Sequence, residues 1–177
     1  MKMAGTGRVN QTVINFQVYE NSTEYYGMAE VGLPEVSSIT TDVKGAGISG
    51  TFQGVVLGHL EAMTLTLNFR TPVKDSYKLL QPYDHHIDLR VANQDKDPVS
   101  GKQITVALKH VFVCQPKKFN PGKVAPATPA DASGEYAVTY WATFINGVKV
   151  LEIDIMNFIY FVDGTDYLAE VRKALGK

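Results

Sequence analysis

Alternation of apolar and polar side chains is the feature that most restricts how this chain can fold. It is clearest over residues 63–70 and 87–91, where the character of the side chain switches at every residue. The same period continues through 104–112 and 151–155. Successive side chains of a strand point to opposite faces of a sheet, so a two-residue period predicts half-buried strands. Weaker alternation adds three strands, near residues 12–19, 28–33 and 36–44.

A hairpin is predicted near the C-terminal end. The stretches 136–145 and 148–161 are separated by Asn146-Gly147. This dipeptide tolerates positive φ at both central positions of a type I′ turn, the connection that suits two antiparallel strands. It is the strongest local structural signal in the sequence.

Helical spacing is limited to two short segments. The first opens at Thr71-Pro72, where threonine can cap a helix and proline suits the first helical position, and Pro82 ends it. The second runs from about residue 165 to 175, with acidic residues near its start and basic residues near its end, as the helix dipole favours. The fold class is therefore mainly β with a short helix packed at the C-terminus.

Composition predicts one domain over residues 1–177. Hydrophobic residues make up 45% and charged residues 20% of the chain, close to the values of globular domains, and no shift in composition marks a second domain. Three irregular segments are expected: a flexible N-terminus (1–11), a glycine-rich loop (45–62) and a proline- and alanine-rich exposed loop (116–134).

Charge and cysteine content exclude several classes of protein. A net charge of -1 lacks the basic excess of a tight nucleic-acid binder. The single Cys114 lies in an apolar run and suits a reducing compartment. Neither a signal peptide nor an apolar stretch of membrane-spanning length is indicated.

The glycines at Gly45, Gly47 and Gly50 match the spacing of a dinucleotide site. That site requires a helix that opens at the motif and holds the pyrophosphate at its N-terminus. The residues that follow, 51–56, do not resemble a helix start. We therefore favour a flexible loop that uses glycine for positive φ.

Other candidate sites for chemistry are poorly supported. His85 and His86, near Asp84 and Asp88, are adjacent on a predicted strand and would point to opposite faces, so a polar strand start is favoured over a metal site. No nucleophile elbow is present, and Cys114 lacks an electropositive setting. We expect no catalytic residue, no metal and no cofactor.

Two patterns leave alternatives open. Glu152 and Asp154 share one face of a strand. They could form a carboxylate pair for acid/base work, but we favour a row that faces solvent or the lumen of an assembly. Trp141 lies among alternating aromatic residues, which can form a ligand platform or contacts within the core or between subunits. The sequence alone does not decide between those last options.

Residues 146–159, followed by Val162-Asp163-Gly164-Thr165-Asp166 and a basic C-terminal helix, resemble the C-terminus of the major tail tube proteins of contractile-tailed phages (myophage type) and related R-type bacteriocins. Two further stretches are similar to that family: a strand containing Ile14-Asn15 and Gly27 that leads to Leu33-Pro34, and the glycine loop at 45–50. The loop at 116–134 departs from the family pattern, which is more charged there.

The resemblance implies an antiparallel β-sandwich or barrel flanked by a short C-terminal α-helix. Copies would assemble as a hexameric ring with a continuous inner β-barrel, and rings would stack into a tube inside a contractile sheath. The subunit would be structural and not an enzyme. Expected partners are further copies of itself, tail sheath, baseplate or tube initiator, tail terminator and DNA in transit, without stable membrane association. The tube would belong to the virion tail and assemble in the host bacterial cytoplasm.

Specific residues follow from this picture. The candidates for an inter-ring stacking loop, which we expect to become ordered between rings, are Gly45, Gly47, Gly50 and Gly54. The candidates for acidic side chains that face the lumen and repel phosphate are Asp42, Glu152 and Asp154. The alternatives are the tube of another contractile injection or secretion machine, and a β-sandwich ligand-binding module that uses Trp141.

Overall fold

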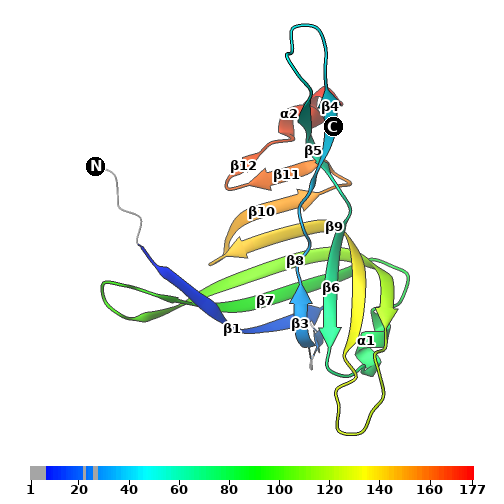
Figure 1. Cartoon of the computed structure of the whole chain (residues 1–177). Coiled ribbons are helices and arrows are strands. Elements are labelled where there is room, and N and C mark those ends of the chain that lie inside the picture. The colour runs from blue at the N-terminus through cyan, green and yellow to red at the C-terminus, as the bar shows by residue number, and fades with distance from the viewer. Residues whose placement is uncertain (1–6, 22, 26–27) are drawn as a thin grey trace.

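The computed structural model of the chain describes residues 7–21, 23–25 and 28–177, which form twelve strands and two short helices (Figure 1). The strands are β1 (Val9–Glu20), β2 (Thr23–Tyr25), β3 (Met28–Gly32), β4 (Ser38–Val43), β5 (Phe52–Leu60), β6 (Met63–Phe69), β7 (His85–Lys96), β8 (Gln103–Asn120), β9 (Ala132–Ile145), β10 (Val148–Asp154), β11 (Ile159–Val162) and β12 (Thr165–Asp166). The helices are α1 (Lys74–Lys78) and α2 (Ala169–Ala174).

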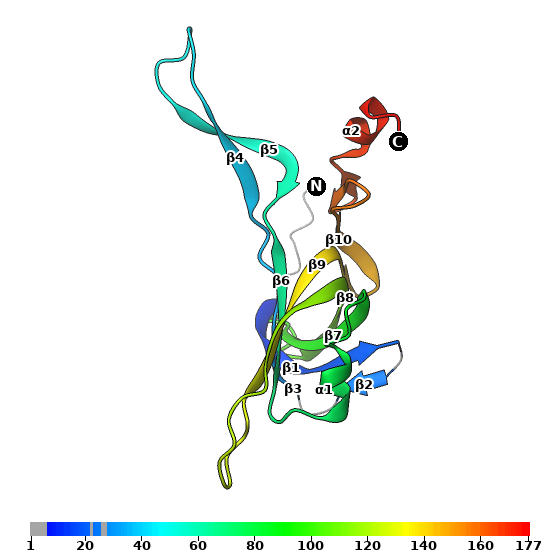
Figure 2. The ribbon, with the colours of Figure 1, turned by 90° about the vertical axis from the view of Figure 1, so that its right-hand side faces the viewer.

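Ten of these strands form one antiparallel sheet. Its main order is β12-β11-β10-β9-β8-β7-β1-β2, and β3 joins through β6, which pairs with β9. Strand β9 is forked: residues 132–138 pair with β6, whereas residues 140–145 pair with β10. Because one strand serves two neighbours on the same edge, the sheet curls and brings β6 and β3 to face β1 and β7 (Figures 1 and 2). The expected sandwich or barrel is thus a single, partly closed sheet.

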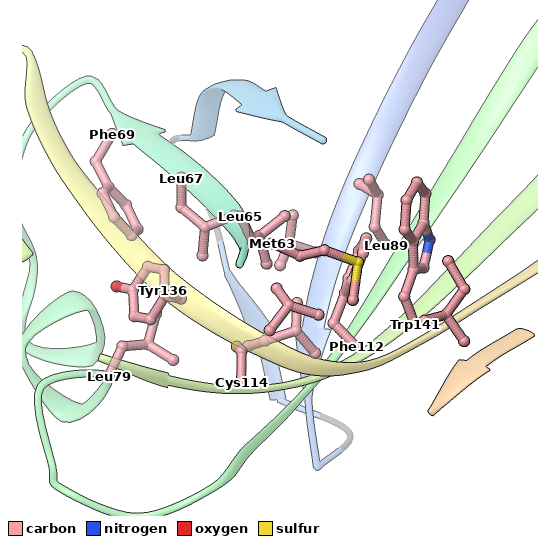
Figure 3. Packing of buried hydrophobic residues seen from close by; sticks show 14 of the residues in the cluster. Met63, Leu65, Leu67, Phe69, Leu79, Leu89, Phe112, Cys114, Tyr136 and Trp141 are labelled. Atoms are coloured by element: carbon pink, nitrogen blue, oxygen red, sulfur yellow. The ribbon is translucent and has the colours of Figure 1, made fainter. Parts of the chain in front are cut away.

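The core lies inside this curl. Strand β6 alternates completely between buried and half-buried positions, as its sequence predicts, and directs Met63, Leu65, Leu67 and Phe69 inward. They pack against buried side chains of β7, β8 and β9, including Phe112 (Figure 3). Complete burial of one such side chain stabilises the fold by about 1.5–3 kcal/mol.

The predicted hairpin at Asn146-Gly147 is confirmed. Both residues have positive φ, 48° and 81°, and the flanking pair is Ile145 with Val148. The continuous strand expected over 148–161 was wrong, because a turn at 155–158 separates β10 from β11. The Asp154 carboxylate accepts hydrogen bonds from the backbone and side-chain nitrogens of Asn157 in this turn, which explains the interruption.

The expected irregular segments are shorter than the sequence suggested. The range 45–62 contains all of β5, because β4 supplies a pairing partner for its β-branched residues. The range 116–134 contains the end of β8 and the start of β9, and Pro116 is accommodated at a shift in the β8–β9 register, leaving 121–131 as the loop. In the range 1–11, residues 9–11 already belong to β1, and residues 1–6 lie outside the described part.

Both helices begin later than expected. The Ser76 hydroxyl, and not Thr71, closes the start of α1: it accepts from the Val73 backbone nitrogen at 2.9 Å and donates to the Val73 carbonyl at 2.6 Å. At the other helix, Thr165–Asp166 pair with β11 as β12, so α2 starts only at Ala169. No helix within the described ranges combines the length and apolarity needed to cross a membrane.

Candidate assembly surfaces

In the described part of the chain, one face of the curled sheet has no layer packed over it. Core side chains of β1, β7, β8, β9 and β10 alternate with side chains that point to this opposite surface, here called the open face. Its polar and aromatic members in the middle of the sheet include Tyr19, Asp88, Arg90, Lys109, Tyr140, Phe144, Lys149, Glu152 and Asp154.

Charges on the open face form neighbouring rows across the strands. Arg90 lies directly opposite Lys109 on the neighbouring strand, and these two positive charges would repel each other without other partners. The Lys109 ammonium lies 3.0 Å from the Asp88 carboxylate, and the Arg90 guanidinium lies 4.9 Å from the centre of the Tyr19 ring. The open face is therefore charge-compensated and not predominantly acidic.

Glu152, one candidate lumen residue, is held in this network. Its carboxylate accepts from the Tyr140 hydroxyl at 2.9 Å and lies 2.5 Å from the Lys149 ammonium. Burial, followed by the bond to this carboxylate, raises the pKa of Tyr140 to about 12. With 17% of its side chain exposed and a lysine partner in place, Glu152 is a structural acceptor and not an available base.

The three candidate lumen residues do not lie together. Glu152 and Asp154 share the open face of β10, as their spacing predicts. Asp42 lies on β4, in the separate two-stranded sheet. Arg90 and Asp88 also lie on the open face, although the sequence did not indicate them as lumen candidates. The alternation of these residues with buried Ile87 and Leu89 was the available signal.

The sheet ends in unpaired strand edges within the described ranges. Strand β2 covers β1 only from Val18 to Glu20, and in the described part of the chain residues 9–16 of β1 pair with β7 alone. Two register shifts interrupt this edge, between Asn10 and Thr12 and between Val13 and Asn15. Strand β3 likewise pairs only with β6. Free edges of this kind are templates for further strands.

The segment that connects β3 to β6 forms a long arm, here defined as residues 38–60. Among the residues that the structure describes, its strands β4 and β5 pair only with each other, and the arm projects away from the main sheet (Figures 1 and 2). Of the four stacking-loop glycines, Gly45, Gly47 and Gly50 lie in the connection at its tip and Gly54 lies within β5. Gly47 has a φ of 86°, which favours glycine. Since β5 and not a helix follows, the dinucleotide interpretation is excluded.

The remaining candidates for chemistry are structural. His85 is buried and contacts the Glu20 carboxylate through Nδ1 and the Gln81 carbonyl through Nε2, whereas His86 points to the opposite face. Among the described residues, no three His, Cys, Asp or Glu side chains are grouped to hold a metal. Burial raises the pKa of the Cys114 thiol to about 12.

Trp141 does not offer a ligand platform. It is 7% exposed, its ring lies 5.8 Å from that of Phe112, and its indole N–H points to His110 Nδ1 at 3.5 Å. These contacts place Trp141 in the core and remove the main support for the β-sandwich ligand-binding module.

A curled antiparallel sheet with an uncovered face, free edges and a projecting arm defines a β-structured assembly subunit. Comparison with known proteins gives the family: the chain belongs to the phage tail tube protein FII family, whose model matches residues 10–176. The tail tube protein of Escherichia phage P2 is 25% identical over 164 residues, which cover 90% of this chain and 93% of that protein.

A solved structure shares the fold. The sheath/tube terminator of an extracellular contractile injection system, PVC, in its extended state superimposes with a TM-score of 0.51 at 10% identity, over 74% of this chain and 94% of that one. With the family match, the chain is a phage tail tube protein. It is a structural component of the tail and not an enzyme. The resemblance stated from the sequence is confirmed.

Proposed function

We propose that this chain, acting as a single tail tube domain, forms hexameric rings that stack into the inner tube of a contractile phage tail, a hollow conduit for DNA. The observation that carries the proposal is the combination of an uncovered sheet face with a free β1 edge. A lone subunit leaves both unsatisfied, whereas a closed ring of subunits would pair the edges and direct all open faces to one interior.

The expected dimensions suit a conduit. About four strands from each of six copies give roughly 24 strands, which at a spacing of about 4.8 Å and a tilt near 40° enclose a backbone diameter of about 50 Å. Side chains on the open face reduce this to a bore of about 40 Å. That bore is wider than a DNA duplex.

The open face suits transit without adhesion. Arg90, Lys109 and Lys149 would attract phosphate, but Lys109 and Lys149 are paired with carboxylates and Arg90 stacks on a tyrosine. Each unpaired lysine or arginine that meets phosphate releases counterions and strengthens binding. We therefore propose a charge-compensated lumen that includes Glu152 and Asp154, and we assign Asp42 to contacts made by the arm.

The arm and its glycines would act between subunits. We propose that Gly45, Gly47, Gly50 and Gly54 belong to an inter-ring contact in which the arm becomes ordered. The outer surface of the tube would meet tail sheath, and its ends would meet the baseplate or tube initiator and the tail terminator. In this scheme the protein belongs to the virion tail and assembles in the cytoplasm of the host bacterium.

Electron microscopy of negatively stained, concentrated protein, alone and with isolated baseplates, tests the proposal together with sedimentation. We expect rings or hollow tubes of uniform width with a bore of about 40 Å. Ile14→Lys places a charge on the exposed β1 edge and should abolish them, whereas Thr128→Lys, in the exposed 121–131 loop, should not. A subunit that stays monomeric even with baseplates present would contradict the proposal.

A further inference from the structure

A groove opens the curled sheet between β1 and β3. It has a volume of about 450 Å³, and its floor and walls are mainly apolar. The side chains that give it this character are Val13, Phe16, Val31, Leu33, Val91 and Leu108. Its single charged member is Glu30, on β3.

The groove is incomplete in its hydrogen bonding as well as in its packing. Both strands that border it, β1 and β3, have a free edge along the groove in the described part of the chain. The side-chain oxygen of Asn93, which also lines the groove, is buried without a hydrogen-bond partner in that part. A buried acceptor that makes no hydrogen bond destabilises the subunit until a donor reaches it. These features together fit an added strand that carries apolar side chains and backbone N–H donors.

The arm of residues 38–60 has the complementary properties. Between residues 38 and 57 it carries only two charged side chains, Asp42 and Lys44. Phe52 and Val55 are 54% and 66% exposed. A two-stranded sheet with exposed apolar residues is marginally stable by itself, so the arm needs a surface to cover it.

We propose that the groove of one subunit receives the arm of a neighbouring copy of this chain. The inference rests on the proposed tube function, and it names the two surfaces that meet. Within one subunit the arm projects away from the groove. It extends beyond the β12 end of the sheet, whereas β1 and β3, whose residues line the groove, lie at the opposite end (Figures 1 and 2).

The contact has a definite chemistry. An arm strand adds to the free edge of β3, since ring closure pairs the edge of β1. Its apolar side chains enter the apolar floor of the groove, and a backbone N–H reaches the Asn93 oxygen. The positive charge of Lys44, near the tip of the arm, is complementary to the negative charge of Glu30 on the wall of the groove. Because the two surfaces lie on different parts of the subunit, the contact is heterologous and passes from copy to copy, as an extended tube requires.

Photo-crosslinking in assembled tubes tests the pairing. Phe52 is replaced by benzoylphenylalanine, tubes are irradiated, and intermolecular adducts are mapped by mass spectrometry. Adducts are expected on the strands that border the groove, within 9–17 and 28–33. Adducts confined to another surface, such as the exposed face of α1 at Val73 and Tyr77 or the 121–131 loop, would overturn the proposal.

Two results separate this inference from the proposed function. Normal tubes with adducts elsewhere refute the groove but leave the tube function standing. Failure of the unsubstituted protein to form rings or tubes, even with baseplates, removes the tube function and this inference together.

A charge swap provides an independent measurement. Glu30→Lys and Lys44→Glu should each raise the critical concentration for tube growth about two- to five-fold, and the double variant should restore it. Lys102→Glu, in the exposed β7–β8 turn, is the matched control and should have no effect. If each single variant raises the critical concentration and the double variant does not bring it back, the placement of the arm tip against Glu30 is refuted.

Discussion

Gly58, at the base of the arm, provides a stringent test of how the arm is attached. Its backbone has a φ of 68°, in the region that favours glycine, and it lies where the β4–β5 register shifts. A Cβ at this position would lie 2.5 Å from both terminal methyl carbons of Leu168 and 2.8 Å from its Cγ. Leu168 is buried immediately before α2, so it has little room to move away.

The expected effect of Gly58→Ala has two parts. A left-handed backbone conformation costs an alanine about 1–2 kcal/mol, and overpacking against a buried side chain costs about 1–3 kcal/mol more. We expect a total loss of about 2–5 kcal/mol in the free energy of unfolding. Gly47→Ala is the matched control, because Gly47 also has positive φ but no atom within 4 Å of the added carbon. Its expected loss is about 1 kcal/mol or less, since alanine also restricts the unfolded chain.

Urea denaturation of the unassembled subunit, followed by tryptophan fluorescence and circular dichroism, measures these differences. Leu168→Ala removes the clashing side chain, so Gly58→Ala should cost only about 1 kcal/mol in that background, a coupling of 1 kcal/mol or more. If Gly58→Ala is as mild as Gly47→Ala, or if its cost is unchanged by Leu168→Ala, the described contact between the arm base and α2 is refuted.

Three further outcomes are expected. Leu65→Ala removes a buried side chain at the centre of β6 and should lower the unfolding free energy by about 2–5 kcal/mol. Val124→Ala, at a fully exposed loop position, should change it by less than about 0.5 kcal/mol. Equal effects of the two substitutions in urea titrations would contradict the placement of Leu65 in the core. The hydrogen bond from Arg172 lowers the pKa of Asp166, so Asp166→Asn should lower the free energy of unfolding at pH 7. The difference in unfolding free energy between the two proteins should shrink as the pH falls below the pKa of aspartate in the unfolded chain, about 3.9. A difference that does not depend on pH would count against this ion pair. The Cys114 thiol should react with a disulfide reagent at neutral pH only after unfolding, and rapid labelling of the native subunit would show that its burial is wrong.

The elements that the sequence predicts well are those whose local pattern and tertiary environment agree. Strand β6 alternates fully because one face is core and the other is not. Asn146-Gly147 fixes its turn through backbone sterics alone. The shared face of Glu152 and Asp154 follows from the strand period and needs no long-range information.

The features that the sequence did not predict depend on distant partners. Strand β5 contains Gly54 and Gly58 and exposes apolar residues, so its alternation is hidden and only pairing with β4 defines it. The fork in β9 requires two different strands to share one edge, which no local period encodes. For the same reason Asp42 could not be separated from Glu152 without the sheet topology.

The two β-bulges of β1 bear on when subunits can join. They interrupt the regular spacing of the free edge between Asn10 and Thr12 and again between Val13 and Asn15, so each regular run is only a few residues long. A strand that meets this edge by chance can match only one such run at a time, so the encounter is short-lived. A strand already oriented by neighbouring subunits can match several runs together. Newly synthesised subunits should therefore remain dispersed until a growing end captures them, so the number of tubes is set by the number of starting points and not by the abundance of subunits.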